Sequence, residues 1–304
     1  MKVIIPVAGY GTRLKPHTDF IQKTLLPVAG KPGLDHILDH LSTGGIRDIV
    51  LIIGHLGDQV IQHCNQRREN FTFIEQQEKL GLGHAVLQGL ENRNDPVLIH
   101  LGDTIFNLDF QQFCSGNINR IAVGTVADPS RFGIVELEGK SIIRFHEKVP
   151  DPPTNLAISG LYYFSNQNKL RRAIISLVQN NHQTRGEYQL TDAMETMLKD
   201  HQPFEAEIIN QWHDIGVPET FLSANRALLE PDHGQHPDCE LVEPVFIGND
   251  CNIKHSRVGP YVTIMNQCII ENCEIEDSII LEGSELKNLK IKGRIVGGDG
   301  EQTC

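Results

Sequence analysis

The last quarter of the chain carries a spacing of aliphatic residues that constrains its fold more than any other feature. Branched apolar side chains recur there at steps of five or six residues: Ile247, Ile253, Val258, Ile264, Ile270, Ile275 and Leu281. Such a repeat is typical of hexapeptide β-helices, in which each step is a short parallel strand and each coil buries its aliphatic residues against the next. A set of ordinary strands is the alternative, but the near-constant step favours the repeat.

The residues before this repeat alternate short apolar runs with amphipathic stretches. Strands are predicted within 1–7, 49–53, 97–101, 121–126 and 161–164. Leu34, Ile37, Leu38 and Leu41 fall at helical spacing before Gly44-Gly45, which predicts a helix that ends there. Strands that alternate with helices indicate an α/β fold with a mostly parallel sheet. The polar stretch 231–237 separates the two patterns, so we predict two domains, at 1–230 and 238–304.

Composition excludes several classes of protein. The 304 residues carry 27 basic and 39 acidic side chains, and this net charge of −12 argues against general nucleic-acid binding. No apolar run is long enough to span a membrane and no signal peptide is recognisable, so we expect a cytoplasmic protein with no membrane partner. The 7 cysteines form no CxxC pair and are expected to be free thiols, with Cys268 and Cys273 buried.

The first predicted strand runs into a glycine-rich turn, Ala8-Gly9-Tyr10-Gly11-Thr12-Arg13-Leu14. Glycines let backbone N–H groups approach an anion, and the cations Arg13, Lys15 and Lys23 lie within or behind the turn. The segment lacks the Lys-Ser/Thr of a Walker loop and the third glycine of a dinucleotide fingerprint. The spacing alone therefore leaves both a phosphate-binding loop and an ordinary turn open.

Two aspartates and two charged pairs are candidates for chemistry. Asp103 follows the apolar run 97–101, and Asp214 lies beside the single tryptophan. Magnesium in phosphoryl chemistry is held by one or two carboxylates plus substrate phosphates, although a loop-capping role is commoner for aspartate. Glu147-Lys148 and Arg185-Gly186-Glu187 suit sugar hydroxyls and phosphate, or are exposed charge pairs. The histidines form no catalytic constellation.

In combination and in order, these segments resemble the sugar-1-phosphate nucleotidyltransferases, above all the long glucose-1-phosphate thymidylyltransferases. The resemblance implies a Rossmann-like catalytic domain over 1–230 and a left-handed parallel β-helix over 238–304. Its motifs are the 8–14 turn with Lys23 and Pro27, Gln76 with Gly81-Leu82-Gly83-His84-Ala85, Leu101-Gly102-Asp103, Arg131-Phe132-Gly133, Glu147-Lys148, Ser159-Gly160-Leu161-Tyr162, Arg185-Gly186-Glu187 with Leu190-Thr191-Asp192, and Trp212-His213-Asp214-Ile215-Gly216.

The resemblance also implies an activity and its residues. The chain would join a hexose-1-phosphate, by preference glucose-1-phosphate, to dTTP with the help of Mg²⁺. A homo-oligomer is expected for a separate reason, because a β-helix has open ends and flat faces. The implied catalytic residues are Arg13, Lys23 and Lys148. The implied nucleotide-binding residues are Ala8, Gly9, Gly11, Thr12, Gln76 and Gly81. The implied sugar-binding residues are Gly133, Glu147, Ile158 and Gly160, and the implied Mg²⁺ ligands are Asp103 and Asp214.

Several positions depart from this family pattern and keep alternatives open. Ala8 and the Gly81-Leu82-Gly83-His84-Ala85 motif look more like uridylyltransferases, so UTP is the alternative nucleotide. Gln22 stands where proline usually precedes the lysine, Thr104 replaces a frequent asparagine, and Val149 separates Lys148 from Pro150. A non-catalytic scaffold paralogue and an acyl-transferring tail are the rival functions. The retained charged residues speak against the first, and the short tail speaks against the second.

Overall fold

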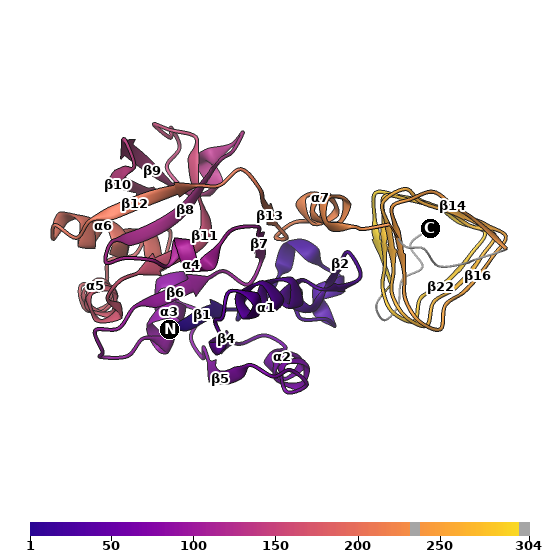
Figure 1. Ribbon diagram of the computed structural model, residues 1–304, viewed down its shortest axis with the longest axis horizontal. Coiled ribbons are helices and arrows are strands. Elements are labelled where there is room, and N and C mark those ends of the chain that lie inside the picture. The colour runs from indigo at the N-terminus through magenta and orange to yellow at the C-terminus, as the bar shows by residue number, and fades with distance from the viewer. Residues whose placement is uncertain (232–237, 298–304) are drawn as a thin grey trace. The chain divides into compact units, whose positions relative to one another are not determined.

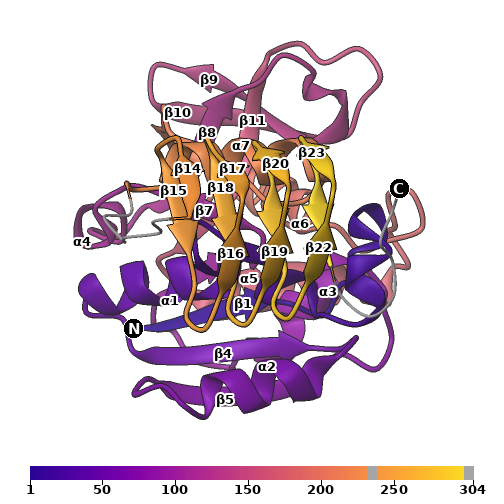
Figure 2. The same cartoon turned by 90° about the vertical axis from the view of Figure 1, so that its right-hand side faces the viewer.

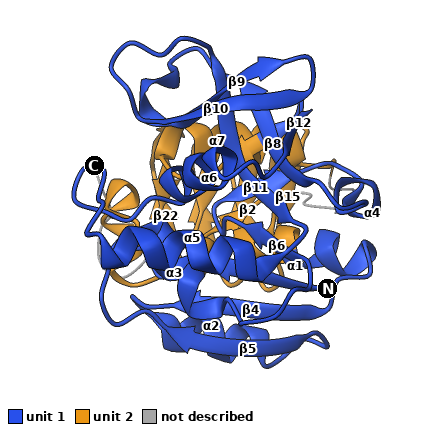
Figure 3. Ribbon diagram, turned by 90° about the vertical axis from the view of Figure 1, so that its left-hand side faces the viewer, with its two compact units in different colours: residues 1–9, 38–212 blue, residues 10–37, 213–304 orange. Residues whose placement is uncertain are grey.

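The structure is a computed structural model that describes residues 1–231 and 238–297. These residues form two compact units (Figure 3). Unit 1 comprises Met1–Gly9 and Leu38–Trp212, and unit 2 comprises Tyr10–Ile37 and the described residues from His213 onward. The boundaries between the units fall within helix α1 (Gly33–Thr43) and strand β13 (Trp212–Asp214). Most of the predicted polar linker, 232–237, lies outside the described residues, and the domain division at 230 stays a prediction.

In the described part of unit 1, the framework is a nine-stranded sheet with the order β5-β4-β1-β6-β11-β8-β12-β10-β9. The strands are β1 (Lys2–Pro6), β4 (Asp48–Ile53), β5 (Asn70–Glu75), β6 (Val97–His100), β8 (Asn119–Thr125), β9 (Gly133–Glu138), β10 (Ser141–Glu147), β11 (Leu156–Phe164) and β12 (Phe204–Ile208). The first four strands in this order are parallel, as is the β8–β12 pair. The remaining pairs are antiparallel. The predicted mostly parallel sheet is therefore parallel in one half and mixed in the other.

The buried strand at the centre of the parallel half explains the opening sequence. Val3, Ile4 and Ile5 are each 0% exposed, because β1 lies between β4 and β6 and is covered on both faces. Parallel strands buried in this way read as continuous apolar runs. The carboxyl ends of these neighbouring parallel strands lead into the residues around Gln76, Gly9 and Asp103. These loops leave the same edge of the sheet.

The helices of unit 1 pack on this sheet and on one another (Figure 1). Besides α1, they are α2 (Gly57–Cys64), α3 (Leu82–Gly89), α4 (Phe110–Phe113), α5 (Gln167–Gln179) and α6 (Leu190–Lys199). Helix α3 packs against β1 and β4, and α6 packs against α5 and β10. The predicted helix before Gly44-Gly45 is confirmed as α1. None of the helices within 1–231 and 238–297 is both long enough and apolar enough to cross a bilayer.

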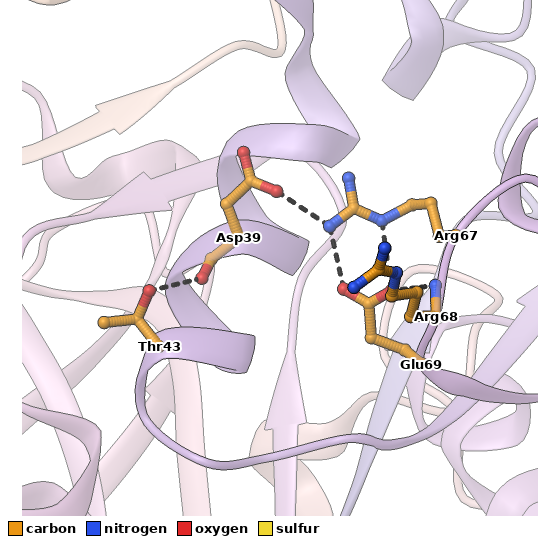
Figure 4. A network of polar contacts seen from close by, with 5 residues as sticks. All are labelled: Asp39, Thr43, Arg67, Arg68 and Glu69. Carbon is orange, nitrogen blue, oxygen red and sulfur yellow. Dashed lines mark hydrogen bonds and ion pairs between the residues drawn. The ribbon is translucent and has the colours of Figure 1, made fainter.

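An ion-pair network ties α1 to the turn between α2 and β5 (Figure 4). Arg67 Nη2 lies 2.7 Å from Asp39 Oδ1 and 2.8 Å from Glu69 Oε1. The Glu69 side chain is only 6% exposed. Burial alone would raise its pKa, but the hydrogen bond and charge of Arg67 outweigh burial and hold the pKa below its usual value. The network therefore fixes the amino end of β5 with a paired, ionised carboxylate.

The C-terminal repeat folds as a parallel β-helix in unit 2, whose coils Figure 1 shows end-on and Figure 2 from the side. Its described strands form three stacked parallel sheets, β14-β17-β20-β23, β15-β18-β21-β24 and β16-β19-β22. The bounds are β14 (Cys239–Leu241), β15 (Val245–Ile247), β16 (Asn252–Lys254), β17 (Ser256–Val258), β18 (Val262–Ile264), β19 (Ile269–Glu271), β20 (Glu274–Glu276), β21 (Ile279–Ile280), β22 (Glu285–Lys287), β23 (Lys290–Lys292) and β24 (Ile295–Val296).

The hexapeptide interpretation is confirmed by burial along these strands. Six of the seven repeat positions, all but the partly buried Ile247, are at most 7% exposed, and all of these six except Leu281 belong to the β-helix core. Cys268 and Cys273 are buried there as free thiols, as predicted. The three-faced stack is the arrangement expected of a left-handed parallel β-helix. Its core needs only short strands, because each coil covers the one before it.

The rest of unit 2 surrounds the glycine-rich segment. It contains three 3-10 turns, η1 (Thr12–Leu14), η2 (His17–Asp19) and η3 (Lys23–Leu25), the short strands β2 (Pro27–Val28) and β3 (Lys31–Pro32), and helix α7 (Pro218–Leu228). Strand β7 (Thr104–Phe106) and the 3-10 turn η4 (Pro129–Arg131) belong to unit 1. The segment that follows β1 is therefore built with the C-terminal third of the chain.

Candidate functional site

Three of the predicted sugar-binding residues lie against one another in unit 1. Gly133, the first residue of β9, is the cross-strand partner of Glu147, the last residue of β10. A Cβ atom on Gly133 would lie 3.2 Å from both Glu147 Oε2 and Ile158 Cδ1, and 2.8 Å from Thr191 Oγ1. The Glu147 side chain is only 6% exposed. Residue 133 is therefore a glycine because a larger side chain would displace Thr191, Glu147 or Ile158.

Lys148 is held next to the same carboxylate by its backbone. It adopts a left-handed conformation with φ of 46°, which is uncommon for a residue other than glycine. Its N–H donates to the Phe132 carbonyl at 3.1 Å, and its own carbonyl accepts from Arg185 Nη2 at 2.6 Å. The Lys148 Nζ then lies 2.9 Å from Glu147 Oε1. The two bracing contacts place a cation beside the predicted sugar-binding residues.

Gly160 connects these residues to the loop that carries Asp103. Its φ is 101°, and its carbonyl accepts the Leu101 N–H at 2.8 Å. A Cβ atom on Gly160 would lie 3.0 Å from Leu101 Cδ1 and 3.1 Å from Thr104 Oγ1. Thr104, which departs from the family pattern, is thus part of this packing. Strand β11 therefore approaches the Asp103 loop closely only because residue 160 has no side chain.

The pKa of a buried tyrosine, Tyr162, reflects the charges in this region. Tyr162 is 4% exposed, and its burial raises the pKa of the phenol above its usual range. The charges of Glu147 and Asp103 push the pKa further in the same direction. Tyr162 is consequently a neutral phenol whose pKa is raised by the charges of both carboxylates. The predicted sugar-binding acid and the predicted metal ligand thus act on one side chain of unit 1.

Gln76 and Gly81 lie close together beside β5, the edge strand of the parallel half of the sheet. Gln76 follows β5, is 7% exposed, and its Nε2 lies 3.4 Å from the Gly81 carbonyl. A Cβ atom on Gly81 would lie 2.7 Å from Glu187 Cβ and 2.9 Å from the Tyr188 carbonyl oxygen. These contacts and the φ of 105° explain the glycine. The two predicted base-binding residues are therefore neighbours.

The segment 184–192, which contains the motifs at 185–187 and 190–192, contacts both groups of residues. Tyr188 packs on Gly81, Thr191 packs on Gly133, and Arg185 donates to Lys148. Burial raises the pKa of Asp192, with the Glu147 charge adding to the rise and a Thr184 hydrogen bond opposing it. Asp192 Oδ2 is buried without a hydrogen-bond partner among the described residues. The order of the Arg185 and Thr191-Asp192 motifs was the only signal that these residues matter.

Ala8 and Gly9 begin the glycine-rich segment at the end of β1. The Ala8 carbonyl accepts from Lys79 Nζ at 3.0 Å and from the His55 N–H at 3.4 Å. Gly9 is exposed, and a Cβ atom there would meet nothing within 4 Å. Ala8 is therefore fixed while Gly9 is open to solvent. Lys79 is a cation near this turn that sequence reasoning missed, because it stands two residues before Gly81 in a loop without a recognisable pattern.

The continuation of the segment in unit 2 forms a compact turn around Gly11. The Gly11 carbonyl accepts from the Leu14 N–H at 2.8 Å and from Thr18 Oγ1 at 2.9 Å. A Cβ atom on Gly11, whose φ is 62°, would lie 2.8 Å from Thr18 Cγ2 and 3.1 Å from Lys23 Cβ. Gly11 thus packs against the stem of Lys23. Thr12 and Arg13 begin the following turn, and both are exposed.

Gln22 has a structural reason for replacing the proline of the family pattern. Its side chain is 1% exposed, and Oε1 accepts from the Thr24 N–H at 2.6 Å and from Thr24 Oγ1 at 2.7 Å. It therefore caps the η3 turn that begins with Lys23. The turn is held by a side-chain hydrogen bond where proline would hold it by restricting φ.

Asp214 lies in unit 2 beside the same turn. Ile215 is 0% exposed, and a Cβ atom on Gly33 would lie 2.5 Å from Ile215 Cδ1 and 3.4 Å from the Thr24 carbonyl oxygen. The tight turn at Gly216 brings its Cα close to the carboxylate, since a Cβ there would lie 2.6 Å from Asp214 Oδ1. Unit 2 thus gathers Gly11, Lys23 and the segment of Asp214. Unit 1 gathers the remaining predicted residues into the two groups described above.

Comparison with known proteins gives one consistent result. The nucleotidyl transferase family profile matches residues 2–231. A glucose-1-phosphate thymidylyltransferase of Streptomyces griseus is 27% identical, and the match covers 98% of this chain and 92% of the relative. The low-salt glycan biosynthesis nucleotidyltransferase Agl11 of Haloferax volcanii is 31% identical, with 97% and 91% covered. A crystal structure from Bacillus anthracis, provisionally assigned as a glucose-1-phosphate thymidylyltransferase, has a TM-score of 0.66 at 27% identity and covers 77% of this chain and 98% of its own.

Proposed function

The chain belongs to the nucleotidyl transferase family as a sugar-1-phosphate nucleotidyltransferase, and we propose that it joins glucose-1-phosphate to dTTP, giving a dTDP-sugar and pyrophosphate. The observation that carries the sugar half of the proposal is the cluster of Gly133, Glu147 and Ile158 with Lys148 beside it. A buried carboxylate packed beside a glycine suits sugar hydroxyls, and the adjacent ammonium suits a phosphate. The near full-length similarity to a thymidylyltransferase supports the choice of substrates.

In this reaction, an oxygen of the sugar phosphate attacks the α-phosphorus of the nucleotide. The bond from the α-phosphorus to the bridging oxygen breaks in line with the attack, and pyrophosphate leaves with the electron pair. The protein makes no covalent bond, so its contribution is position and charge. Lys148 would hold the sugar phosphate, and Arg13 and Lys23 would neutralise the nucleotide phosphates. Glu147, Gly133 and the backbone of Ile158 to Gly160 would fix the sugar ring.

The nucleotide would be bound by the glycine-rich segment and by the first turn of α3. Backbone N–H groups from Ala8 to Thr12 would face the phosphates, since glycines at 9 and 11 allow close approach. The Gln76 amide and the Gly81 backbone would read the edge of the base. Gln76 is buried and has a spare hydrogen-bonding atom, which is the property that base recognition requires.

Asp103 and Asp214 would supply carboxylate oxygens, which are the type of ligand that Mg²⁺ prefers. Hard divalent cations take carboxylate and phosphate oxygens, and Mg²⁺ needs only one or two carboxylates when substrate phosphates complete the shell. Within 1–231 and 238–297, no group of three or more histidine, cysteine, aspartate or glutamate side chains is arranged to hold a metal alone. Bound Mg²⁺ would supply charge neutralisation at the phosphates, as in other phosphoryl transfers.

UTP is the second candidate nucleotide, because Ala8 and the motif at 81–85 favour a uridylyltransferase. Pyrophosphate release with dTTP, UTP, GTP, CTP and ATP against glucose-, mannose-, galactose- and N-acetylglucosamine-1-phosphate tests both. We expect the highest rate with dTTP and glucose-1-phosphate, and a higher rate with UTP would replace the proposal by its alternative. No release with any pair would favour the scaffold function. The predicted homo-oligomer is checked separately by light scattering of the whole chain.

A further inference from the structure

The surroundings of Gln76 define which way its side-chain amide faces. Nε2 lies 3.4 Å from the Gly81 carbonyl oxygen and 3.4 Å from His84 Nδ1. The Gln76 backbone is fixed as well, because its N–H donates to the Ile53 carbonyl at 2.9 Å. Among the described residues, Gln76 Oε1 accepts no hydrogen bond, although the side chain is 7% exposed. One end of this buried amide is thus engaged, and the other is available to a ligand.

The engaged end must be the nitrogen. A carbonyl oxygen only accepts hydrogen bonds, so the amide NH₂ of Gln76 is the group that faces Gly81. The same NH₂ then faces His84 Nδ1, which must carry the lone pair, and the ring proton resides on Nε2. Gln88 Nε2 lies 3.3 Å from His84 Nε2 and 3.5 Å from the His84 carbonyl oxygen, and because Gln88 is exposed, its amide can rotate to place Oε1 opposite that proton. His84 Nδ1 and the Gly81 carbonyl oxygen together present two acceptors to the NH₂ group of Gln76.

The backbone around His84 is held in place by hydrogen bonds and close packing. His84 lies in the first turn of α3, where the Gly83 N–H donates to the Tyr188 carbonyl at 2.8 Å and the Ala85 N–H donates to the Gly81 carbonyl at 3.0 Å. A Cβ atom on Gly83 would lie 2.7 Å from the Tyr188 oxygen, so the helix end cannot shift toward that segment. The backbone that carries His84 is therefore held by packing and hydrogen bonds at the start of α3.

We propose that His84 is a positioning residue that fixes the Gln76 amide with its oxygen toward the nucleotide base, and so selects bases that carry a ring N–H. This inference rests on the proposed role of Gln76 in base recognition. Uracil and thymine present an N3–H donor, which Gln76 Oε1 accepts. Cytosine presents a lone pair at N3, which would face the lone pairs of Oε1. A site whose acceptor is held in place discriminates strongly, since the wrong base leaves that acceptor unpaired.

Two substitutions of His84 separate this role from a structural one. His84→Leu removes the acceptor at Nδ1, whereas His84→Asn retains one, because the asparagine Oδ1 occupies nearly the same position. The measurement is the ratio of kcat/KM for UTP or dTTP, whichever the wild type uses better, to kcat/KM for CTP. We expect His84→Leu to lower this ratio roughly tenfold, mainly through KM, as the loss of one oriented hydrogen bond implies. His84→Asn should stay within about threefold of wild type, well below a tenfold change.

The outcomes distinguish this inference from the proposed function. If wild type releases pyrophosphate and His84→Leu keeps the wild-type ratio, the role of His84 is refuted while the activity stands. The same holds if His84→Asn loses the ratio as completely as His84→Leu, or if the wild type prefers CTP. If the wild type releases no pyrophosphate with any nucleotide, the proposed function fails. Equilibrium dialysis of UTP against CTP on the three proteins then tests the selection alone, with a tenfold change in the ratio of Kd values expected.

Discussion

The two ends of the glycine-rich segment are supported in different ways. Ala8 and Gly9 continue a strand that is hydrogen-bonded to neighbours on both sides, and the Val7 N–H still donates to the Ile52 carbonyl at 2.8 Å. The residues from Tyr10 to Ile37 belong to unit 2. There the Ala29 N–H donates to Asn225 Oδ1 at 2.8 Å, and His17 Nδ1 lies 3.1 Å from the Gly297 carbonyl. The first end relies on backbone hydrogen bonds of a sheet, and the second on contacts with residues far away in sequence.

This difference suggests a role for the β-helix that its sequence does not reveal. A Cβ atom on Gly30 would lie 2.6 Å from the Phe246 ring, so the β2–β3 turn packs directly on the first coils. Asn225 of α7 bridges the turn to the coil, because Oδ1 also accepts from Thr263 Oγ1 at 2.7 Å. The β-helix is thus a support of the segment that contains Lys23. Changes in the β-helix should therefore affect phosphate binding as well as stability.

The largest effect is expected from Asp103→Asn in unit 1. Loss of the carboxylate charge weakens metal binding and transition-state stabilisation, so kcat/KM should fall at least about 10³-fold, or roughly 4 kcal/mol. Asp151→Asn removes a charge from an exposed position and is the matched control, with kcat/KM close to wild type. A fully active Asp103→Asn enzyme would show that the proposed metal ligand is wrong. Pyrophosphate release at saturating Mg²⁺ is the measurement.

The second prediction concerns the coil that follows β17. Gly259 has φ of 107°, and a Cβ atom there would overlap the Val242 carbonyl oxygen, so Gly259→Ala combines backbone strain with a clash. We expect a loss of about 3–5 kcal/mol in unfolding free energy. Gly283→Ala is the control, since its φ is 72° but nothing lies within 4 Å, and it should cost only about 1 kcal/mol.

Urea denaturation compares the stability of the two glycine variants, and the KM for the nucleotide tests whether the β-helix supports the segment. An unchanged KM in a Gly259→Ala protein that is measurably destabilised would break the proposed link between the β-helix and the phosphate-binding turn. Equal losses of stability in Gly259→Ala and Gly283→Ala would instead mean that the clash contributes nothing.

Sequence reasoning succeeded where the determining interactions are local. The apolar run of Val3 to Ile5 predicts a strand buried on both faces, and the steps of five and six residues predict the β-helix, because periodicity is a property of neighbouring residues. It could not predict that the second half of the sheet is mixed, since a short apolar run carries no information on strand direction. It also could not find the Ala29–Asn225 hydrogen bond, which joins positions 196 residues apart.

For the candidate site, the sequence predicted residues but not their supports. The pairing of Gly133 with Glu147 follows from two motifs that were both recognised, and the structure puts them side by side. The roles of Tyr188, Thr191 and Lys79 depend on how loops from different strands meet at one edge of the sheet. Such contacts arise from tertiary packing, for which a single sequence has no periodic signal.

The third prediction tests the bridge at Asn225. This side chain is 1% exposed, and Asn225→Ala would leave the Ala29 N–H and the Thr263 hydroxyl without their acceptor. We expect a loss of about 2–4 kcal/mol, since each buried unpaired group costs about 1–3 kcal/mol. Amide hydrogen exchange at Ala29 should rise with it. Retained protection at Ala29 would show that the turn is held by other contacts, such as the one between Gly30 and Phe246.

The fourth prediction concerns how the unfolding free energy depends on acid pH through His100, which lies in the nine-stranded sheet. His100 in β6 is 1% exposed, and burial lowers its pKa from 6.5 to about 4, while its hydrogen bond to the Leu101 carbonyl opposes the shift. The unfolded chain binds a proton near pH 6.5 and the folded chain does not, so stability falls as the pH drops from about 6.5 towards 4. The loss is about 2 kcal/mol at pH 5.

His100→Asn retains a donor for the Leu101 carbonyl but does not titrate. The difference in unfolding free energy between pH 7 and pH 5 should therefore be about 2 kcal/mol smaller in the variant than in wild type. Other titrating groups are common to both proteins and cancel in this comparison. Identical pH slopes would mean that His100 is protonated in the folded state or stays neutral in the unfolded one.

The smallest effect is expected from the residue next to Asn225. Arg226 pairs with Asp277 of the β-helix through both Nε and Nη2, and this bond raises the pKa of the guanidinium, but the arginine side chain is 47% exposed. Exposed ion pairs contribute about 0–1 kcal/mol because solvent and salt screen them. Arg226→Ala should thus reduce stability by less than about 1 kcal/mol, and still less in high salt. A loss as large as that of Asn225→Ala would mean that the charged pair, rather than the buried amide, joins α7 to the β-helix.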